Sequence, residues 1–596
     1  MVFRSLRGDG IERAVLRDIG TCRRAFGALG LSGGLARLCV LVAIAFLVSS
    51  FSAFAAGDEL NRQKIRALDD PLWTDLQAVL LDAGRVELSP TPPYSDARIV
   101  AELDAVDPGR LSPPAEAARQ RILAELAEVL PLRSGPLAGR IGIEAAPALE
   151  WRSSKSTPWI LGYADREPLL SIPVELAFAN SFYGYSALAL KADPNLVAAG
   201  PLSPGGLNVA ELAAAPIGID ATFPFRSFGS VGGDWWNFQI GRDRLSFGSA
   251  GPWNLTISQA AEFYDFARLS LFSPGFAYSG LVAQLDPERN LYLHRFDLRF
   301  GGGLSLGVTE ASLVGTAPLE LRYLNPFMIF HGFQAWSDYA SQGVSSKEGS
   351  SNEVGIEVDW SPLPWLALSG QYVMNQISDP LKLFFWPSVS EIPNGEGWLA
   401  SLKFRAPLEK EFIVATITGA YTTPTLYISP WSASNTAASA VLSDGVGSPI
   451  SWAYDRPAKS NYASGSSQAW IGFSEGPDTI LAALSAGLDA GSAWALLGDL
   501  AWKARGSMDR FGATNNWDTP SSPDSSNWSL LTPSGIAEYD LVAGLSARKA
   551  LPSLPASFRG GLSGAIHWTG RWNANHVAGA FDQSWEIDSV MTIRFR

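Results

Sequence analysis

The feature that most constrains this chain is a two-residue alternation of apolar and polar side chains, which recurs in short segments from residue 139 to the C-terminus. Between Trp494 and Arg505, apolar side chains occupy the even positions, whereas Asp499 and Lys503 lie on the opposite face. The last segment, Trp585 to Arg596, repeats this pattern. A soluble sandwich would bury each apolar face against a second sheet, but here charges recur on the other face throughout. The pattern therefore favours a closed barrel with lipid outside and water inside, completed by the last segment.

Counting these segments gives roughly 18 to 20 antiparallel strands of about ten residues each. Residues 353–360 and 398–405 are further clear examples, with acidic or basic side chains alternating with apolar ones. Arg295, Asp297 and Arg299 share one face of another segment. We interpret these three side chains as charges in the lumen.

The lengths of the connections predict how the strands are oriented. The short connection 549–555 is expected to be periplasmic and the long polar segment 506–534 to lie outside, because outer-membrane barrels have their longer loops outside. This orientation requires one more strand between residues 422 and 466, for which Pro449–Asp455 is the candidate. The side on which residues 244–261 lie is left open.

Residues 1–55 are typical of an export leader. Arg37 precedes the apolar run Leu38–Val48, and Ala53-Phe54-Ala55 supplies a small-x-small cleavage pattern. We therefore expect a mature chain that begins at Ala56.

Composition limits the remaining classes of protein. Both cysteines, Cys22 and Cys39, lie in the leader, so the mature chain is expected to have neither a disulfide nor a thiol-based metal site. Charged residues make up only 17%, yet no run beyond the leader approaches the ~20 apolar residues of a membrane-spanning helix. The leader holds seven Arg and three acidic residues, so its removal lowers the net charge from −13 to −17. That balance argues against nucleic acid as a partner.

A small α-helical bundle is predicted for residues 56–136, ahead of the barrel at 137–596. Asp70 and Pro71 form a helix start, Gly84 a helix stop, and further helices are predicted to begin at Ser95 and Ser112. The expected apolar stripes are Leu72, Leu76, Val79 and Leu80; Ile99, Leu103 and Val106; and Ile122, Leu126, Val129 and Leu130. Helices this short are unstable alone. We expect them to pack together and against the periplasmic end of the barrel.

Two stretches resemble the capsule assembly Wzi family. The first, Asn237 to Gln259, reads NFQIGR and then FGSAGPWNLTISQ; the second, Leu293 to Phe327, reads LHRF, LSLGVTE and YLNPF. Phe247 departs from the family, which usually has Trp there. The resemblance implies an 18-stranded outer-membrane barrel with an N-terminal helical bundle, acting as a lectin-like factor that retains or organises surface polysaccharide. The residues that carry the resemblance are Gly241, Arg242, Ser258, Glu310, Asn325 and Pro326.

The outer loops contain the residue types that bind sugars, namely flat aromatic rings and planar amides. Our candidates are Asn516, Trp517 and Trp528 in the long polar segment and Trp572 in the last outer loop. The alternative is that barrel loops are generally rich in these residues and that tryptophans gather at membrane interfaces. The same loops also contain Asp518, Asn527, Arg571, Asn573 and His576.

The residues of the family motifs also have plain structural interpretations. Gly241 would lie at a strand end, Arg242 and Glu310 would face the lumen, and Asn325-Pro326 would end a ladder of strand hydrogen bonds. We expect these residues to support the fold and to have no catalytic role.

Signals of enzyme chemistry are weak. Gly472 to Gly476 matches the spelling of a nucleophile elbow around Ser474, but no helix is predicted after it, as that motif requires. The four histidines have no metal-ligand spacing. A catalytic triad assembled across strands stays open as a minor alternative. We expect no catalytic residue, metal or cofactor.

The leading hypothesis is a non-enzymatic, monomeric protein of the bacterial outer membrane, in contact with lipid and with capsule or exopolysaccharide. The main alternative is a porin or solute channel, because Arg295, Asp297, Arg405 and Lys503 could line a pore. Conductance across a planar bilayer would distinguish the two.

Overall fold

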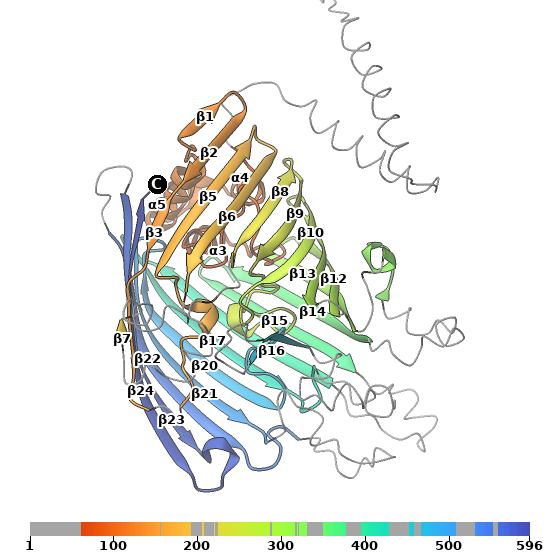
Figure 1. Ribbon diagram of the computed structural model, residues 1–596, viewed down its shortest axis with the longest axis vertical. Helices are drawn as coiled ribbons and strands as arrows, with labels where there is room; N and C mark the ends of the chain where they lie inside the picture. The colour runs from red at the N-terminus through yellow and green to blue at the C-terminus, as the bar shows by residue number, and fades with distance from the viewer. Residues whose placement is uncertain are drawn as a thin grey trace, which may run out of the picture. The chain divides into compact units, whose positions relative to one another are not determined.

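The computed structural model describes residues 61–154, 157–191, 206–207, 220, 224–286, 289–315, 319, 321–330, 350–376, 395–427, 452–457, 466–507, 531–551 and 558–595. The expected leader and mature start lie outside these residues. Three helices, α3 (Leu72–Asp82), α4 (Asp96–Asp104) and α5 (Pro113–Leu126), precede a large closed sheet (Figure 1). Each begins at or next to the predicted residue. Within the described part of the chain, none of the helices combines the length and the apolar character needed to cross a bilayer.

Eighteen antiparallel strands form a closed barrel, as predicted. The first is broken into β2 (Leu137–Ile141), β3 (Ile143–Ala145) and β4 (Ala148–Arg152). The others are β5 (Leu170–Phe178), β6 (Phe182–Leu190), β8 (Ser227–Gly232), β9 (Trp236–Asp243), β10 (Tyr264–Phe272), β11 (Phe276–Asp286), β12 (Arg289–Phe300), β13 (Leu304–Gly315), β14 (Ser350–Leu363), β15 (Leu366–Gln376), β16 (Gly395–Pro407), β17 (Phe412–Thr422), β20 (Thr479–Asp489), β21 (Trp494–Arg505), β22 (Glu538–Ala550), β23 (Phe558–Trp572) and β24 (Phe581–Phe595). Strand β24 pairs with β3 and β4, so the C-terminal strand closes the barrel as expected.

Four short strands lie outside this wall. Strand β1 (Leu132–Ser134) forms a hairpin with β2, β7 (Gly206–Leu207) pairs with β4, and β18 (Ala453–Pro457) pairs with β19 (Ser466–Trp470) in a separate sheet. The wall strand predicted at Pro449–Asp455 was therefore wrong, although β18 overlaps it. Because β17 pairs directly with β20, the chain between them begins and ends at the same end of the barrel and needs no further crossing.

The wall has the predicted two faces. In β21, the outward side chains of Leu496, Leu500 and Trp502 are 43%, 45% and 38% exposed. In β12, Arg295 and Asp297 point inward and are almost fully buried. An apolar exterior and a polar interior are what a lipid-facing barrel requires.

The two ends of the barrel differ (Figure 1). Short turns join the strands at one end, which we call the helix end, whereas most of the connections at the other, the loop end, are long. Arg299, beside the turn 301–303, pairs with Glu102 of α4 at 2.9 Å. Arg121 of α5 donates to the Ala490 carbonyl beside another short turn, also at 2.9 Å. The helices thus pack against the end with the short turns, as predicted.

The helices and the wall share one apolar core. Asp70 caps α3 by accepting a hydrogen bond from the Leu72 N–H at 3.0 Å, and Gly84 has a φ of +68° just after the helix. Helix α5 ends at Leu126, before the last two residues of its predicted apolar stripe, and Val129 is exposed. The nearby Pro131 explains the early end, because the residue before a proline disfavours the helical conformation. The core contains Leu72, Leu76, Val79, Leu80, Ile99, Leu103, Val106, Ile122 and the wall residue Phe412.

Candidate functional site

Residues 244–263, between β9 and β10, fold into the lumen. We call this segment the plug. Phe247 and Ile257 form an antiparallel bridge within it. Leu255 and Ile257 are completely buried, in one cluster with side chains from β10 to β13, from β15 to β17 and from β20. The segment whose side the sequence left open thus lies inside the barrel.

Side-chain amides fix the plug to the wall. Gln371 on β15 accepts a hydrogen bond from the Leu255 N–H at 3.0 Å and donates to Asn254 at 2.9 Å. The N–H of Ser249 donates to Glu357 on β14 at 2.8 Å. The plug is therefore part of the hydrogen-bonded structure of the barrel.

A second buried layer packs against the plug. The Tyr427 hydroxyl donates to the Leu255 carbonyl and accepts from the Phe473 N–H at 3.0 Å. Trp452 and Trp470, from the β18–β19 region, are almost fully buried in the same cluster. These aromatic rings add a further obstacle to passage along this part of the lumen.

Another segment lies against the opposite part of the wall. Glu586 on β24 accepts hydrogen bonds from the backbone N–H groups of Ile160 and Leu161, at 2.8 and 2.9 Å. Thr157 donates to Asp582 at the start of β24 at 2.9 Å. Protein therefore occupies the lumen beside β24 as well as beside the plug.

The lumen charges pair with other charges in the protein. Arg295 contacts Asp297 and Glu357, both at 2.7 Å. Arg405 pairs with Asp489 at 2.9 Å, and Lys503 pairs with Glu475 at 2.5 Å. The residues that could have lined a pore therefore form ion pairs instead.

A network of charges crosses the loop end of the last strands. Glu538 on β22 contacts Arg505 on β21 and Arg571 on β23, both at 2.5 Å. It also accepts a hydrogen bond from the Asn575 N–H at 2.6 Å, and the Asn573 amide donates to the Ala537 carbonyl at 2.9 Å. The last outer turn, 573–580, is thus tied to the start of β22.

The predicted sugar-binding residues are only partly described. Asn516, Trp517 and Trp528 lie outside the described residues. Trp572 lies on the outward face of β23, 43% exposed, with its ring 5.3 Å from that of Phe581. This position is typical of the aromatic girdle of a membrane barrel. A role of these residues in sugar binding remains a prediction.

Two of the family-motif residues support the wall beside the plug. Gly241 has a φ of +139°, and a Cβ there would lie 2.3 Å from the Ser227 carbonyl oxygen, so close strand packing requires glycine. Ser258 is buried in the plug, and its N–H donates to the Ile471 carbonyl at 2.8 Å. Both positions have structural roles.

The expectation that Arg242 and Glu310 face the lumen was wrong. Arg242 lies on the outward face of β9 and makes two hydrogen bonds of 2.7 Å to Asp265. Glu310, on the outward face of β13, contacts His294 at 3.0 Å. The strand period alone could have revealed this, because Arg242 and Glu310 share parity with exposed apolar neighbours such as Ile240.

The His294–Glu310 pair is covered from outside by residues 321–330, which we call the outer strap. Phe330 stacks on His294 with ring centroids 4.4 Å apart, and Tyr323 stacks on Tyr292 at 4.7 Å. Within the strap, Asn325 accepts a hydrogen bond from the Phe327 N–H at 3.1 Å, and Pro326 lies in that turn. The motif residues Asn325 and Pro326 therefore shape a segment that packs on the outside of the wall.

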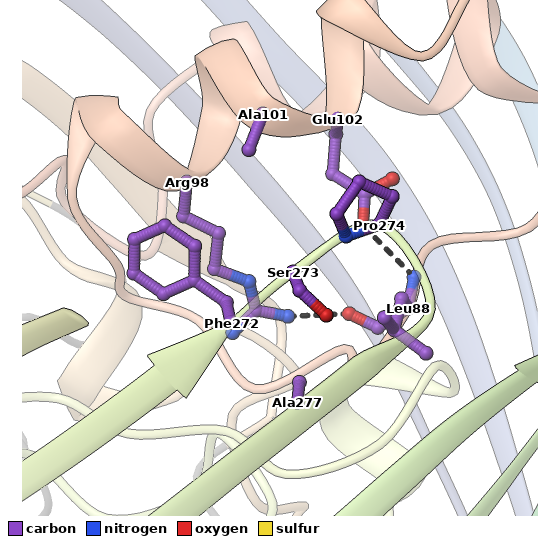
Figure 2. A pocket seen from close by; sticks show the side chains of 8 residues that line it. All are labelled: Leu88, Arg98, Ala101, Glu102, Phe272, Ser273, Pro274 and Ala277. Carbon is purple, nitrogen blue, oxygen red and sulfur yellow. Dashed lines mark hydrogen bonds between the residues drawn. The ribbon is translucent and has the colours of Figure 1, made fainter. Parts of the chain in front are cut away.

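Two hollows remain beside the helices. A cavity of about 350 Å³ lies between α3, the plug and strands β14 to β17. The other, of about 10 Å³, lies where α4 meets the turn between β10 and β11; Figure 2 shows Arg98 and Glu102 of α4 bonded to Leu88 beside it. A space of that size holds at most a water molecule. Of these two hollows, the larger has the size of a ligand site.

The described residues assemble neither a nucleophile elbow nor a metal site. Ser474 is followed by a turn and then by β20, which begins at Thr479. Groups of three or more possible metal ligands are absent from the described part of the chain. His567 lies on the inward face of β23, 3.5 Å from Asp499.

These features define a class of protein. The barrel is closed, antiparallel and built from an even number of strands, with an apolar exterior, aromatic rings near its rim and long loops at one end. This is the architecture of bacterial outer-membrane barrels. Its distinguishing features are the helices at one end and the plug within the lumen.

Comparisons with known proteins agree with this class. No protein-family model and no curated protein matches the chain. Among solved structures, the chain is similar to Wzi, an outer-membrane protein involved in group 1 capsule assembly in Escherichia coli and described as a carbohydrate-binding β-barrel. The TM-score is 0.53 at 13% identity, covering 89% of this chain and 99% of that one. The resemblance predicted from the motifs is thus confirmed for the fold.

Two barrels of Pseudomonas aeruginosa are less similar. OccD3 (OpdP) gives a TM-score of 0.40 at 8% identity, covering 77% of this chain and 91% of that one. OccD1 (OprD) gives 0.37 at 10% identity, covering 77% and 95%.

Proposed function

We propose that this protein is a non-enzymatic barrel of the bacterial outer membrane that binds capsule or exopolysaccharide at its loop end and thereby helps to attach or organise it. The observation that carries the proposal is the occupied lumen. The plug, with Leu255 and Ile257 fully buried, and the aromatic layer against it favour binding at the surface over passage through the barrel.

The two ends support an orientation. The loop end would face outward and the helix end the periplasm, because outer-membrane barrels carry short turns on the periplasmic side. Lipid would contact the apolar exterior, and a monomer would suffice because the wall is complete within one chain.

The similarity to a carbohydrate-binding barrel of capsule assembly supports the choice of polysaccharide. Binding would rest on stacking and hydrogen bonding, because the expected net charge of −17 gives no long-range attraction for an acidic polymer. Asn516, Trp517 and Trp528 are the proposed contacts. Trp572, on the outward face of β23, would contribute only if the polymer reaches that face.

Replacing Trp517 and Trp528 together by alanine tests the proposal. Each ring is expected to contribute about 0.5–1.5 kcal/mol beyond its buried area, so binding should weaken about tenfold or more while the barrel still folds. The measurements are glycan retention on cells and pull-down by the purified barrel.

Trp494→Ala, in the girdle, should affect insertion and leave binding intact, and Ser474→Ala should change neither. Unchanged retention in a folded double variant would contradict the proposal for these loops.

The channel alternative has its own test. Purified barrel in a planar bilayer is expected to show no large, stable conductance, because protein occupies the lumen on both sides. A large conductance that persists in every preparation would favour the porin over the attachment factor.

A further inference from the structure

The outer strap, residues 321–330, packs on the wall through one of its faces. Tyr323 and Phe330 lie in one buried cluster with the wall residues Tyr292 and Val314. Met328 packs against the same cluster. These contacts hold the strap against the outside of β12 and β13, in a position that a loop at the rim of a barrel reaches only by folding back along the wall.

The other face of the strap is apolar and exposed. It presents Leu321, Phe327 and Ile329. Phe327 is 89% exposed, whereas Val308, an outward residue of β13, is 41% exposed. The strap thus projects its apolar side chains further from the protein than the wall beside it does. Exposed apolar surface of this kind marks contact with a membrane or with another protein.

The backbone of the strap is suited to a medium without water. The Asn325 N–H donates to the Arg322 carbonyl at 3.3 Å. The Phe327 N–H donates to the side-chain oxygen of Asn325 at 3.1 Å, and the Met328 N–H donates to the Asn325 carbonyl at 3.2 Å. Pro326 has no N–H. Every N–H from residue 325 to residue 328 is therefore bonded within the strap, as lipid requires, because an unsatisfied backbone group is costly there.

The strap lies over the outer half of the wall. Strand β12 begins at the loop end with Arg289. The ring of Tyr323 stacks on Tyr292 and that of Phe330 on His294, three and five residues beyond that start. At ~3.3 Å per residue and a strand tilt of ~40°, these contacts lie roughly 8 to 13 Å below the start of the strand. Since the apolar band of such barrels is ~25 Å tall, this is the depth of the outer leaflet.

The chemistry of the strap favours lipid as its contact. Its ten residues contain one charged side chain, Arg322, whose guanidinium lies over the Tyr323 ring at 5.2 Å. The exposed face continues the apolar exterior formed by outward wall residues such as Val308 and Ile356. Acyl chains can cover an irregular apolar surface of this kind without any matching polar group.

We propose that the outer strap is a lipid-binding loop inserted in the outer leaflet, where Leu321, Phe327 and Ile329 contact acyl chains. The strap thereby holds the loop end of the barrel at a fixed height in the membrane. This inference rests on the proposed outer-membrane location and does not depend on polysaccharide binding.

A nitroxide spin label at residue 327 tests the proposal. Both natural cysteines lie in the expected leader, so Phe327→Cys gives a single labelling site in the mature barrel, refolded into phosphatidylcholine vesicles. Power saturation in electron paramagnetic resonance measures collisions of the label with oxygen, which concentrates in lipid, and with a water-soluble nickel chelate. We expect frequent collisions with oxygen and severalfold fewer with the chelate than at Val577→Cys in the last outer turn.

Val308→Cys, on the outward face of β13, is the matched control for a wall position in lipid. All three replaced side chains are exposed, so the barrel should fold in each variant, and heat-modifiable migration checks this. Chelate collisions at residue 327 as frequent as at residue 577 would place the strap in water. Protection of residue 327 from both reagents would place it under a second copy of the chain. Either result overturns the proposal while residue 308 still reports lipid. Frequent chelate collisions at residue 308 would instead contradict the membrane location itself.

Discussion

The two ends of the barrel are closed by segments of different local structure. At the helix end, three short helices pack on one another, and their apolar side chains meet wall residues such as Phe412, Phe272 and Ala367. At the loop end, a segment without helix or strand periodicity folds inward and is held by single polar groups such as Gln371 and Tyr427. Both closures bury apolar side chains and add polar contacts, but the helices are packed elements with their own stripes, whereas the plug depends on single side chains that fix its backbone.

The largest difference is expected in cysteine labelling, which tests which end of the barrel faces the outside of the cell. Both natural cysteines lie in the expected leader, so one introduced cysteine would be unique in the mature chain. We expect that an impermeant thiol reagent labels Val577→Cys in intact cells and does not label Arg110→Cys. Both positions are well exposed, so access to the side chain is matched. Labelling of Arg110→Cys in unbroken cells would reverse the orientation.

The next effect concerns the helix end. Phe412→Ala should lower the free energy of unfolding by about 3–5 kcal/mol, because the ring is 1% exposed and its removal opens a cavity between helices and wall. Urea unfolding of barrel refolded into vesicles measures this. Ile413→Ala, the neighbouring outward residue at 44% exposure, should cost much less. Equal losses in the two variants would mean that the helices do not stabilise the wall.

A smaller effect is expected at the loop end. Tyr427→Phe removes the hydroxyl that joins Leu255 of the plug to Phe473, which leaves two buried backbone groups without a partner at a cost of about 1–3 kcal/mol. Hydrogen exchange should become faster at Phe473. Tyr264→Phe is the control, because the Tyr264 hydroxyl is buried without a hydrogen-bond partner in the described residues. If both variants exchange equally, the hydroxyl bridge does not hold the plug.

Much of the wall could be predicted because its signal is periodic. Strands β14, β16 and β21 contain the segments 353–360, 398–405 and 494–505, and the inward position of Arg295 and Asp297 follows from parity. The helix starts were equally accessible, since Asp70 and Gly84 are local signals. The outward position of Arg242 and Glu310 was missed because charge was given more weight than parity.

The plug and the cavity could not be predicted, because their contacts join residues far apart in the sequence. Gln371 meets Leu255 across 116 positions, and Tyr427 meets Leu255 across 172. The sequence of a loop has no hydrophobic periodicity that would indicate whether the loop folds into the lumen or away from it. The extra wall strand was predicted for a related reason, since counting strands does not show that β17 and β20 are neighbours.

The outer strap has a consequence for the order of assembly. His294 and Glu310 are ionisable groups on a lipid-facing wall, where bare polar groups are costly. The outer strap covers this pair with the ring of Phe330. Its own outer surface is apolar, with Phe327 and Ile329 89% and 70% exposed. Strands β12 and β13 therefore gain a surface compatible with the bilayer only after a later part of the chain has folded back over them. In the proposed outer-membrane setting, insertion of this section of the wall would be coupled to the docking of the outer strap, which is not itself a strand of the barrel.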